Sequence, residues 1–229
     1  MPRSDPRPPT LPVGRGTTLS QRRCERGAPM DQPNTTDAWY TERLRSGRGS
    51  LWRRLLPDPY RWNLRRLALG RVLDIGCGVG RCLGFLDGHG VGIDHNPTSV
   101  AACRQAGFEA YTPEQFSALD LGQFDSLLLS HVLEHLEAPD GRALIERYLP
   151  HLRSGGRIIL ITPQERGQRS DPTHVRFVDS ADGRALLAEL GAADIDARSF
   201  PLPRIFGRVF THNETVLIGT LSGGGDPAD

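Results

Sequence analysis

A glycine turn flanked by two acidic residues is the part of this sequence best suited to chemistry. Residues 72–81 read VLDIGCGVGR, an apolar strand carrying Asp74, then a tight turn, then the start of a helix. The turn has a glycine at every second position: Gly76, Gly78 and Gly80. Glycine lets a backbone approach a ligand closely because it has no Cβ atom. A second apolar run ends in Asp94, whose carboxylate is placed to accept hydrogen bonds from a ribose diol. Together these features predict half of a nucleoside-binding site.

The spacing of the turn argues against a dinucleotide. A dinucleotide fingerprint, G-x-G-x-x-G/A, needs a third small residue, and Arg81 stands at that position. The carboxylate of Asp74 would repel a pyrophosphate but suits a cationic ligand. S-adenosylmethionine (SAM) carries an ammonium and a sulfonium group. The run D-I-G-C-G-V-G resembles the first motif of class I SAM-dependent methyltransferases.

The resemblance implies SAM as the cofactor. Asp74 and the glycine turn would hold its methionine end, and Asp94 its ribose. In the family, an acid after the third strand usually meets the adenine amino group. Here Thr112 occupies that position and Glu114 comes slightly late, which is a departure from the pattern. The full set of expected cofactor-binding residues is Asp74, Gly76, Cys77, Gly78, Gly80, Asp94, His95, Thr112, Glu114, Ser130 and His131.

The run S-H-V-L-E-H at residues 130–135 resembles the junction after the fourth strand in small-molecule methyltransferases related to the ubiquinone biosynthesis enzymes. H-x-x-E-H also matches an inverted zinc-protease motif, but that motif must lie on a helix, whereas His131 ends an expected strand. Plant small-RNA 2′-O-methyltransferases place Mg²⁺ on a related E-x-x-E-H run. His131 replaces the first acid and is a poorer ligand for a hard cation. We therefore expect no metal, and we expect Glu134 and His135 to satisfy a helix N-terminus.

A long loop at residues 162–177 follows the expected fifth strand, and long loops in compact domains are usually functional. Its segment D-P-T-H-V-R-F resembles one found in many small methyltransferases. A hydroxyl acceptor benefits from a general base with a near-neutral pKa, which histidine provides. His174 is the first candidate base and His131 the second; a purely structural role for His174 is the alternative. Gln164, Arg176 and Arg204 are the candidate acceptor-binding residues.

Strand and helix patterns alternate along most of the chain. Strands are expected at residues 71–76, 90–94, 108–111, 124–130, 156–162, 194–199 and 214–221. Helices are expected at 80–87, 98–106, 113–119, 134–152 and 180–190. This alternation predicts a doubly wound α/β fold. The resemblance implies a seven-stranded, mostly parallel sheet with a C-terminal antiparallel hairpin, as in class I methyltransferases.

Composition divides the chain into four parts. We expect a disordered N-terminal extension at residues 1–35, a helical lid at 36–70, the SAM-binding domain at 71–221 and a flexible tail at 222–229. Met30 opens a more protein-like stretch and is a candidate translation start. All 28 basic residues are arginine, which is typical of a GC-rich bacterial genome.

The net charge of +1 offers no global field for nucleic acid or an anionic membrane. Four cysteines without a metal-binding spacing indicate reduced thiols. The expected protein is a cytoplasmic methyltransferase acting on a small molecule, most readily at oxygen, in bacterial specialised metabolism. It is expected to bind neither nucleic acid nor membrane. The alternatives are a non-catalytic SAM-binding protein, an NAD(P)-dependent oxidoreductase and an RNA methyltransferase.

Overall fold

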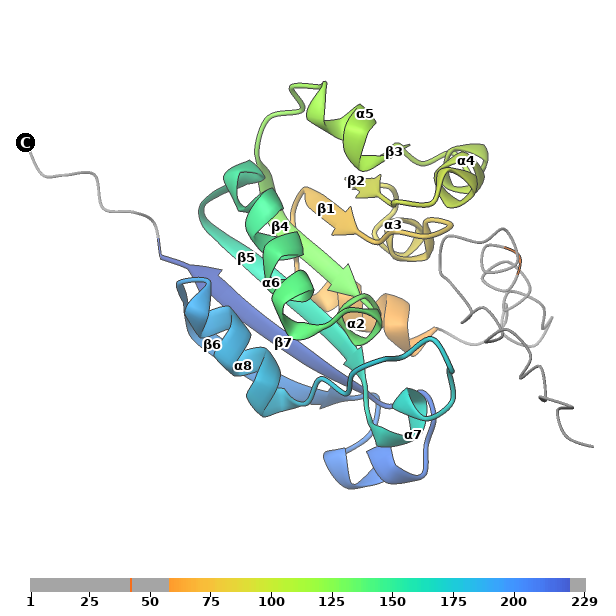
Figure 1. The fold of residues 1–229 in the computed structure, drawn as a ribbon, viewed down its shortest axis with the longest axis vertical. Helices are drawn as coiled ribbons and strands as arrows, with labels where there is room; N and C mark the ends of the chain where they lie inside the picture. The colour runs from red at the N-terminus through yellow and green to blue at the C-terminus, as the bar shows by residue number, and fades with distance from the viewer. Residues whose placement is uncertain (1–41, 43–57, 223–229) are drawn as a thin grey trace, which may run out of the picture. The chain divides into compact units, whose positions relative to one another are not determined.

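A seven-stranded sheet forms the centre of the described part of the chain, which in this computed structural model comprises Glu42 and residues 58–222. The strands are β1 (Val72–Ile75), β2 (Gly90–Ile93), β3 (Ala110–Tyr111), β4 (Phe124–Ser130), β5 (Leu152–Pro163), β6 (Ala192–Phe200) and β7 (Glu214–Leu221). Their order across the sheet is β3-β2-β1-β4-β5-β7-β6 (Figure 1). β7 pairs antiparallel with β5 and β6, and the other pairs are parallel. The predicted fold class is confirmed.

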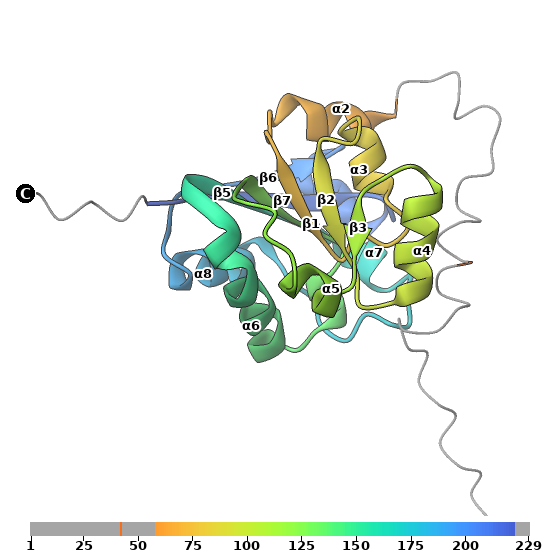
Figure 2. The same ribbon diagram turned by 90° about the horizontal axis from the view of Figure 1, so that it is seen from above.

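Two layers of helices cover the sheet. The helices are α2 (Pro59–Arg66), α3 (Arg81–Phe85), α4 (Pro97–Gln105), α5 (Pro113–Ser117), α6 (Ala138–Tyr148), α7 (Glu165–Gln168) and α8 (Ser180–Glu189). Among the described residues, three short 3₁₀ segments accompany them: η2 (Leu133–His135), η3 (Leu149–His151) and η4 (Arg204–Arg208). Helices α5, α6 and α8 lie on one face, and α2, α3 and α4 lie on the other (Figure 2).

The two apolar layers follow from the alternation of side chains along the central strands. Leu127 and Leu129 of β4 belong to the core beneath α5, α6 and α8. Leu128, between them, belongs to the core beneath α2 and α3. Successive side chains of a strand point to opposite faces, so a continuously apolar strand supplies both cores.

The predicted helix at residues 134–152 is wrong in its extent. The structure divides it into η2, α6 and η3. α6 carries a proline in its first turn, where the missing N–H costs nothing, and Glu137 is its N-cap residue in extended conformation. A second proline lies within η3. Prolines therefore set both boundaries.

The expected extension at 1–35, the candidate start Met30, most of the expected lid and the tail from residue 223 lie outside the described residues. Within the described end of the lid, α2 and the segment after it bury Leu64, Leu67 and Leu69 against the sheet. A role as a lid stays a prediction. Among the residues that the structure describes, no helix is long and apolar enough to span a membrane.

Candidate active site

The glycine turn leaves β1 in a conformation that demands glycine. Gly76, Gly78 and Gly80 all have positive φ angles, of 77°, 53° and 80°. Side chains with a Cβ atom rarely adopt this left-handed region. A Cβ atom on Gly76 would lie 2.5 Å from Cγ2 of Val132, so the turn also approaches the segment after β4 closely. The backbone N–H groups of Gly76 and Cys77 both donate to the carbonyl of Ile93 at the end of β2.

Asp94 joins this turn to the next strand. Its Oδ2 atom accepts from the N–H of Gly78 at 2.8 Å, and its Oδ1 atom accepts from the N–H of Asn96 at 2.8 Å. The residue is 8% exposed. Each carboxylate oxygen has a second lone pair. The two backbone bonds thus orient Asp94 and leave acceptor capacity for a ligand's hydroxyl groups.

Asp74 is a buried carboxyl group with an unsatisfied oxygen. It is 1% exposed, and its Oδ2 atom receives no hydrogen bond from the described residues. Burial, followed by the charge of Asp94, raises its pKa to about 7. A buried acceptor without a partner costs stability, and its retention points to a ligand that supplies a donor. The unsatisfied oxygen and the nearby charge of Asp94 both favour a cationic donor.

The other expected cofactor residues are positioned less directly. Thr112 is the N-cap of α5, where its hydroxyl accepts from the N–H of Gln115. Glu114 is exposed in the first turn of the same helix. The side chain of His95 is 52% exposed, and Ser130 ends β4. Thr112 therefore has a structural function, and contacts of these residues with SAM stay predictions.

His131 lies between two carboxylates. Its Nδ1 atom is 3.0 Å from Oε1 of Glu134, and its Nε2 atom is 2.8 Å from Oε1 of Glu214. Burial lowers the pKa of His131, but the hydrogen bonds to both glutamates outweigh it and raise the pKa to about 10. Both ring nitrogens then donate, so the group is an imidazolium at neutral pH. This geometry does not favour the predicted role of His131 as a second base.

His174 has the opposite character. Its Nδ1 atom is 3.1 Å from the carbonyl oxygen of Gln168, which identifies Nδ1 as the donor and Nε2 as the acceptor. Nε2 lies 4.0 Å from Oε1 of Glu134. Burial lowers the pKa of His174, so the ring is neutral at pH 7. A neutral ring with an accepting Nε2 atom beside a carboxylate is suited to take up a proton.

The same place could also hold a metal. Glu134, His135 and His174 offer three ligand atoms within 4.8 Å of one another. Nδ1 of His135 is 3.0 Å from the carbonyl oxygen of Thr173, and Oε2 of Glu134 is buried and receives no hydrogen bond from the described residues. Two imidazoles and a carboxylate suit a transition metal better than Mg²⁺. The absence of a metal stays a prediction.

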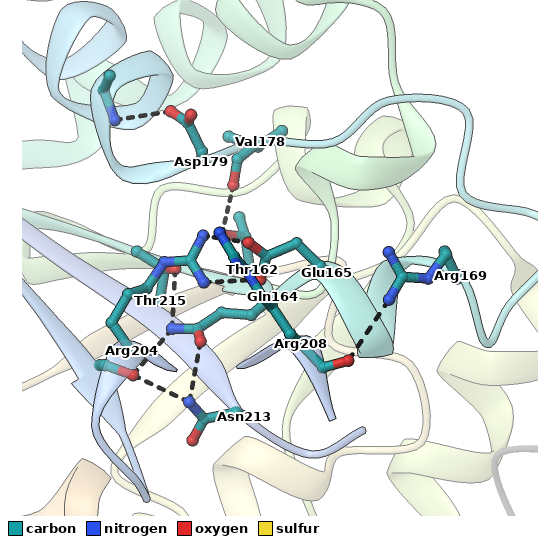
Figure 3. A network of polar contacts seen from close by, with 12 residues as sticks. Thr162, Gln164, Glu165, Arg169, Val178, Asp179, Arg204, Arg208, Asn213 and Thr215 are labelled. Atoms are coloured by element: carbon teal, nitrogen blue, oxygen red, sulfur yellow. Dashed lines mark hydrogen bonds and ion pairs between the residues drawn. The ribbon is translucent and has the colours of Figure 1, made fainter. Parts of the chain in front are cut away.

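The expected acceptor-binding residues form contacts within the protein. Gln164 is fully buried, and its amide donates to the Glu214 carbonyl. It also accepts from the amide of Asn213 (Figure 3). Arg204 makes two bonds of 2.6 Å to Glu165. The backbone N–H of Arg176 donates to the Glu134 carbonyl. These contacts give Gln164 and Arg204 structural functions, and their contact with an acceptor stays a prediction.

Sequence reasoning missed Glu214. This residue begins β7, is 7% exposed and binds His131 from a position 83 residues further along the chain. β7 pairs with β5 so that Glu214 lies opposite Pro163 at the end of β5. The register between β5 and β7 cannot be read from local sequence spacing, so the contact between Glu214 and His131 could not be predicted. The one available signal was the expected C-terminal hairpin, which includes β7.

Comparison with known proteins agrees with this geometry. Residues 73–158 match the family model of a methyltransferase domain. A ubiquinone biosynthesis O-methyltransferase of Xanthomonas oryzae pv. oryzae is 33% identical over 107 residues, which cover 42% of this chain and 44% of that protein. The chain thus matches less than half the length of this curated relative.

Solved structures extend the likeness to the whole fold. A SAM-dependent methyltransferase from Archaeoglobus fulgidus superposes with a TM-score of 0.60 at 21% identity, covering 80% of this chain and 99% of that one. Magnesium protoporphyrin IX methyltransferase from Synechocystis with bound S-adenosylhomocysteine gives 0.57 at 17% identity, covering 82% and 97%. The chain therefore has the fold of class I methyltransferases, residues 73–158 match a methyltransferase domain, and the predicted resemblance is confirmed.

Proposed function

We propose that this protein transfers a methyl group from SAM to an oxygen atom of a small-molecule acceptor. The observation that carries the proposal is Asp74, a buried carboxyl group with an unsatisfied oxygen beside Asp94 and the glycine turn. These residues fit SAM, because the carboxylates suit its cationic end and the glycine turn lets the ligand approach the backbone closely. When bound, SAM supplies an electrophilic methyl group on its sulfonium.

Holding SAM falls to Asp74 and Asp94, and the remaining chemistry falls to residues after β4 and β5. Asp94 would accept hydrogen bonds from the ribose, and Asp74 would bind the ammonium group. The acceptor hydroxyl would lose its proton to Nε2 of His174 as its oxygen takes the methyl group. Glu134, with its Oε1 atom 4.0 Å away, would stabilise the imidazolium that forms. His131 stays protonated and holds Glu134 and Glu214 in place.

Small-molecule specificity is supported by the near-neutral net charge, since phosphate contacts dominate binding to nucleic acids. The related O-methyltransferases support oxygen as the acceptor atom. A place in bacterial specialised metabolism is part of the proposal and rests on composition alone. The main rival is a protein that binds SAM without transferring its methyl group.

Methyl-tritiated SAM tests this proposal directly. The purified protein is added to an extract of a host strain that lacks the gene, and the extract is then separated into small molecules, lipids, protein and nucleic acid. We expect label in the small molecules or the extractable lipids. Label in protein or nucleic acid would contradict the acceptor class. Absence of label in every fraction, with SAM binding confirmed, would favour the non-catalytic rival.

A further inference from the structure

An exposed apolar segment lies between β6 and β7. Within the described residues, seven large hydrophobic side chains are exposed, and four of them occur between positions 202 and 209. These four form what we call the apolar tip: Leu202, Ile205, Phe206 and Val209, with exposed fractions of 37%, 74%, 44% and 73%. Isolated exposed hydrophobic residues are normal, but a concentration in one short segment marks an interaction surface.

The tip is held by a buried polar network. The N–H of Leu202 donates to Oδ1 of Asn213 at 2.9 Å, and Nδ2 of Asn213 donates to Gln164. Gly207 fits directly over Gln164, because a Cβ atom there would fall 2.0 Å from Oε1 of that side chain. η4 also packs against α7, which lies beside it in Figure 1. A fixed base thus supports the exposed side chains.

Exposed arginines lie within the segment that carries the tip and on the neighbouring helix α7. Four exposed arginines on α7, η4 and the residues adjoining α7 form what we call the basic rim: Arg166, Arg169, Arg204 and Arg208. Within residues 164–170 and 201–213, Glu165 is the only acidic residue, and it pairs with Arg204. Four arginines and one glutamate give these two segments a net charge of +3, whereas the whole chain carries only +1. Asp171 follows the first segment, and the charge of Asp179 acts on Arg204.

We propose that the apolar tip and the basic rim bind the surface of an anionic lipid bilayer. Apolar side chains can enter the boundary between headgroups and acyl chains, and basic residues attract anionic headgroups. Arginine also spans this boundary, because its stem is apolar and its guanidinium is polar. A second copy of the chain is a poorer partner, since two surfaces of charge +3 would repel each other across a symmetric contact.

The position of this surface connects it with the candidate active site. The segment carrying the tip leads into β7, whose first residue, Glu214, binds His131. Bilayer binding would therefore place the end of β5 and the start of β7 beside the membrane. An acceptor dissolved in the lipid could then reach the candidate active site. That last step rests on the proposed methyltransferase function, whereas bilayer binding does not. The expectation of no membrane partner came from the net charge of the chain, which conceals the local charge.

Co-sedimentation of the full chain with lipid vesicles tests the proposal without SAM. We expect binding to vesicles of equal parts phosphatidylglycerol and phosphatidylcholine, weaker binding to pure phosphatidylcholine, and weakening with added salt. The double variant Ile205→Glu/Val209→Glu should bind about tenfold more weakly or worse, because it places two charges at the bilayer boundary. Both positions are more than 70% exposed, so the fold should persist, as thermal unfolding would verify.

Leu119→Glu is the matched control, because Leu119 is 41% exposed and lies outside the tip and rim. It should bind vesicles like the unmodified chain. Equal losses in the control and the double variant would overturn the proposal, as would a failure of the unmodified chain to bind anionic vesicles. Self-association that the double variant abolishes, without vesicle binding, would instead identify a second copy as the partner.

Discussion

Asp74→Asn is expected to weaken SAM binding about a hundredfold while making the ligand-free protein more stable above pH 7. The loss of affinity follows from removing the charge that would pair with the ammonium group, since hydrogen bonds between charged groups are the strong ones. The gain in stability follows from the buried position of Asp74, which is 1% exposed with an unsatisfied oxygen.

The pH dependence of this effect has a definite sign. The pKa of Asp74 is about 7 in the folded protein and 3.8 as the ordinary value, so the folded state holds the proton more tightly than the unfolded state. Tighter proton binding by Asp74 in the folded state stabilises the fold fully below pH 4, and this stabilisation is lost as the pH rises through 7. Ionised Asp74 then costs about 2 to 4 kcal/mol, which asparagine avoids. The stabilisation should appear at pH 8 and be small at pH 4.

Thermal unfolding at both pH values and calorimetric titration with SAM measure the two effects. Asp94→Asn is the matched control, because Asp94 accepts backbone hydrogen bonds from Gly78 and Asn96. It should lose SAM affinity without becoming more stable. Unchanged SAM affinity in Asp74→Asn would remove Asp74 from the proposed site. If Asp74→Asn were less stable than the unmodified protein at pH 8, the ionised carboxylate of Asp74 would not be destabilising the folded state.

His174→Asn is expected to reduce kcat about a hundredfold or more while leaving the affinity for SAM unchanged. Asparagine can still donate to the carbonyl of Gln168, as Nδ1 does now, but it cannot accept a proton. General base catalysis typically contributes a factor of this size. Because burial lowers the pKa of His174, kcat of the unmodified enzyme should be constant from neutral pH upward and decline only in more acidic solution.

His89→Asn, at an exposed position outside the site, is the control for this variant. Full turnover by His174→Asn with the true acceptor would rule out the base role and leave His174 a structural residue. We expect activity to survive dialysis against EDTA, because the proposed base needs no metal. Loss of activity on that dialysis, with recovery on adding Mn²⁺ or Zn²⁺, would instead make Glu134, His135 and His174 metal ligands.

Features that depend on local sequence could be predicted well. The glycine turn, Asp74 and Asp94 lie within 21 consecutive positions, and β1, the turn and β2 bring them together without help from the rest of the chain. The doubly wound sheet followed from the alternation of strands with helices, and its antiparallel C-terminal hairpin from the resemblance. The interrupted helix at residues 134–152 could have been suspected from Pro139 and Pro150.

Features that depend on distant pairing could not be predicted. The bond between His131 and Glu214 joins positions 83 residues apart and exists only because β7 is inserted beside β5. That bond changes His131 from a candidate base to an imidazolium. Gln164 likewise reads as a polar loop residue, yet it is buried under Gly207 and Asn213. The exposure of the apolar tip could not be predicted either, because apolar side chains in a loop read the same in the sequence whether they are buried or exposed.

Binding of SAM by the glycine turn with Asp74 and Asp94 is central to the proposed function. The most direct test is calorimetric titration of the purified chain with SAM at pH 8, with NAD titrated in parallel. We predict one SAM bound per chain, an affinity that falls as the pH is lowered below 7 because Asp74 becomes protonated, and no measurable binding of NAD. Binding of NAD in place of SAM would contradict the proposed function and indicate a dinucleotide-dependent protein.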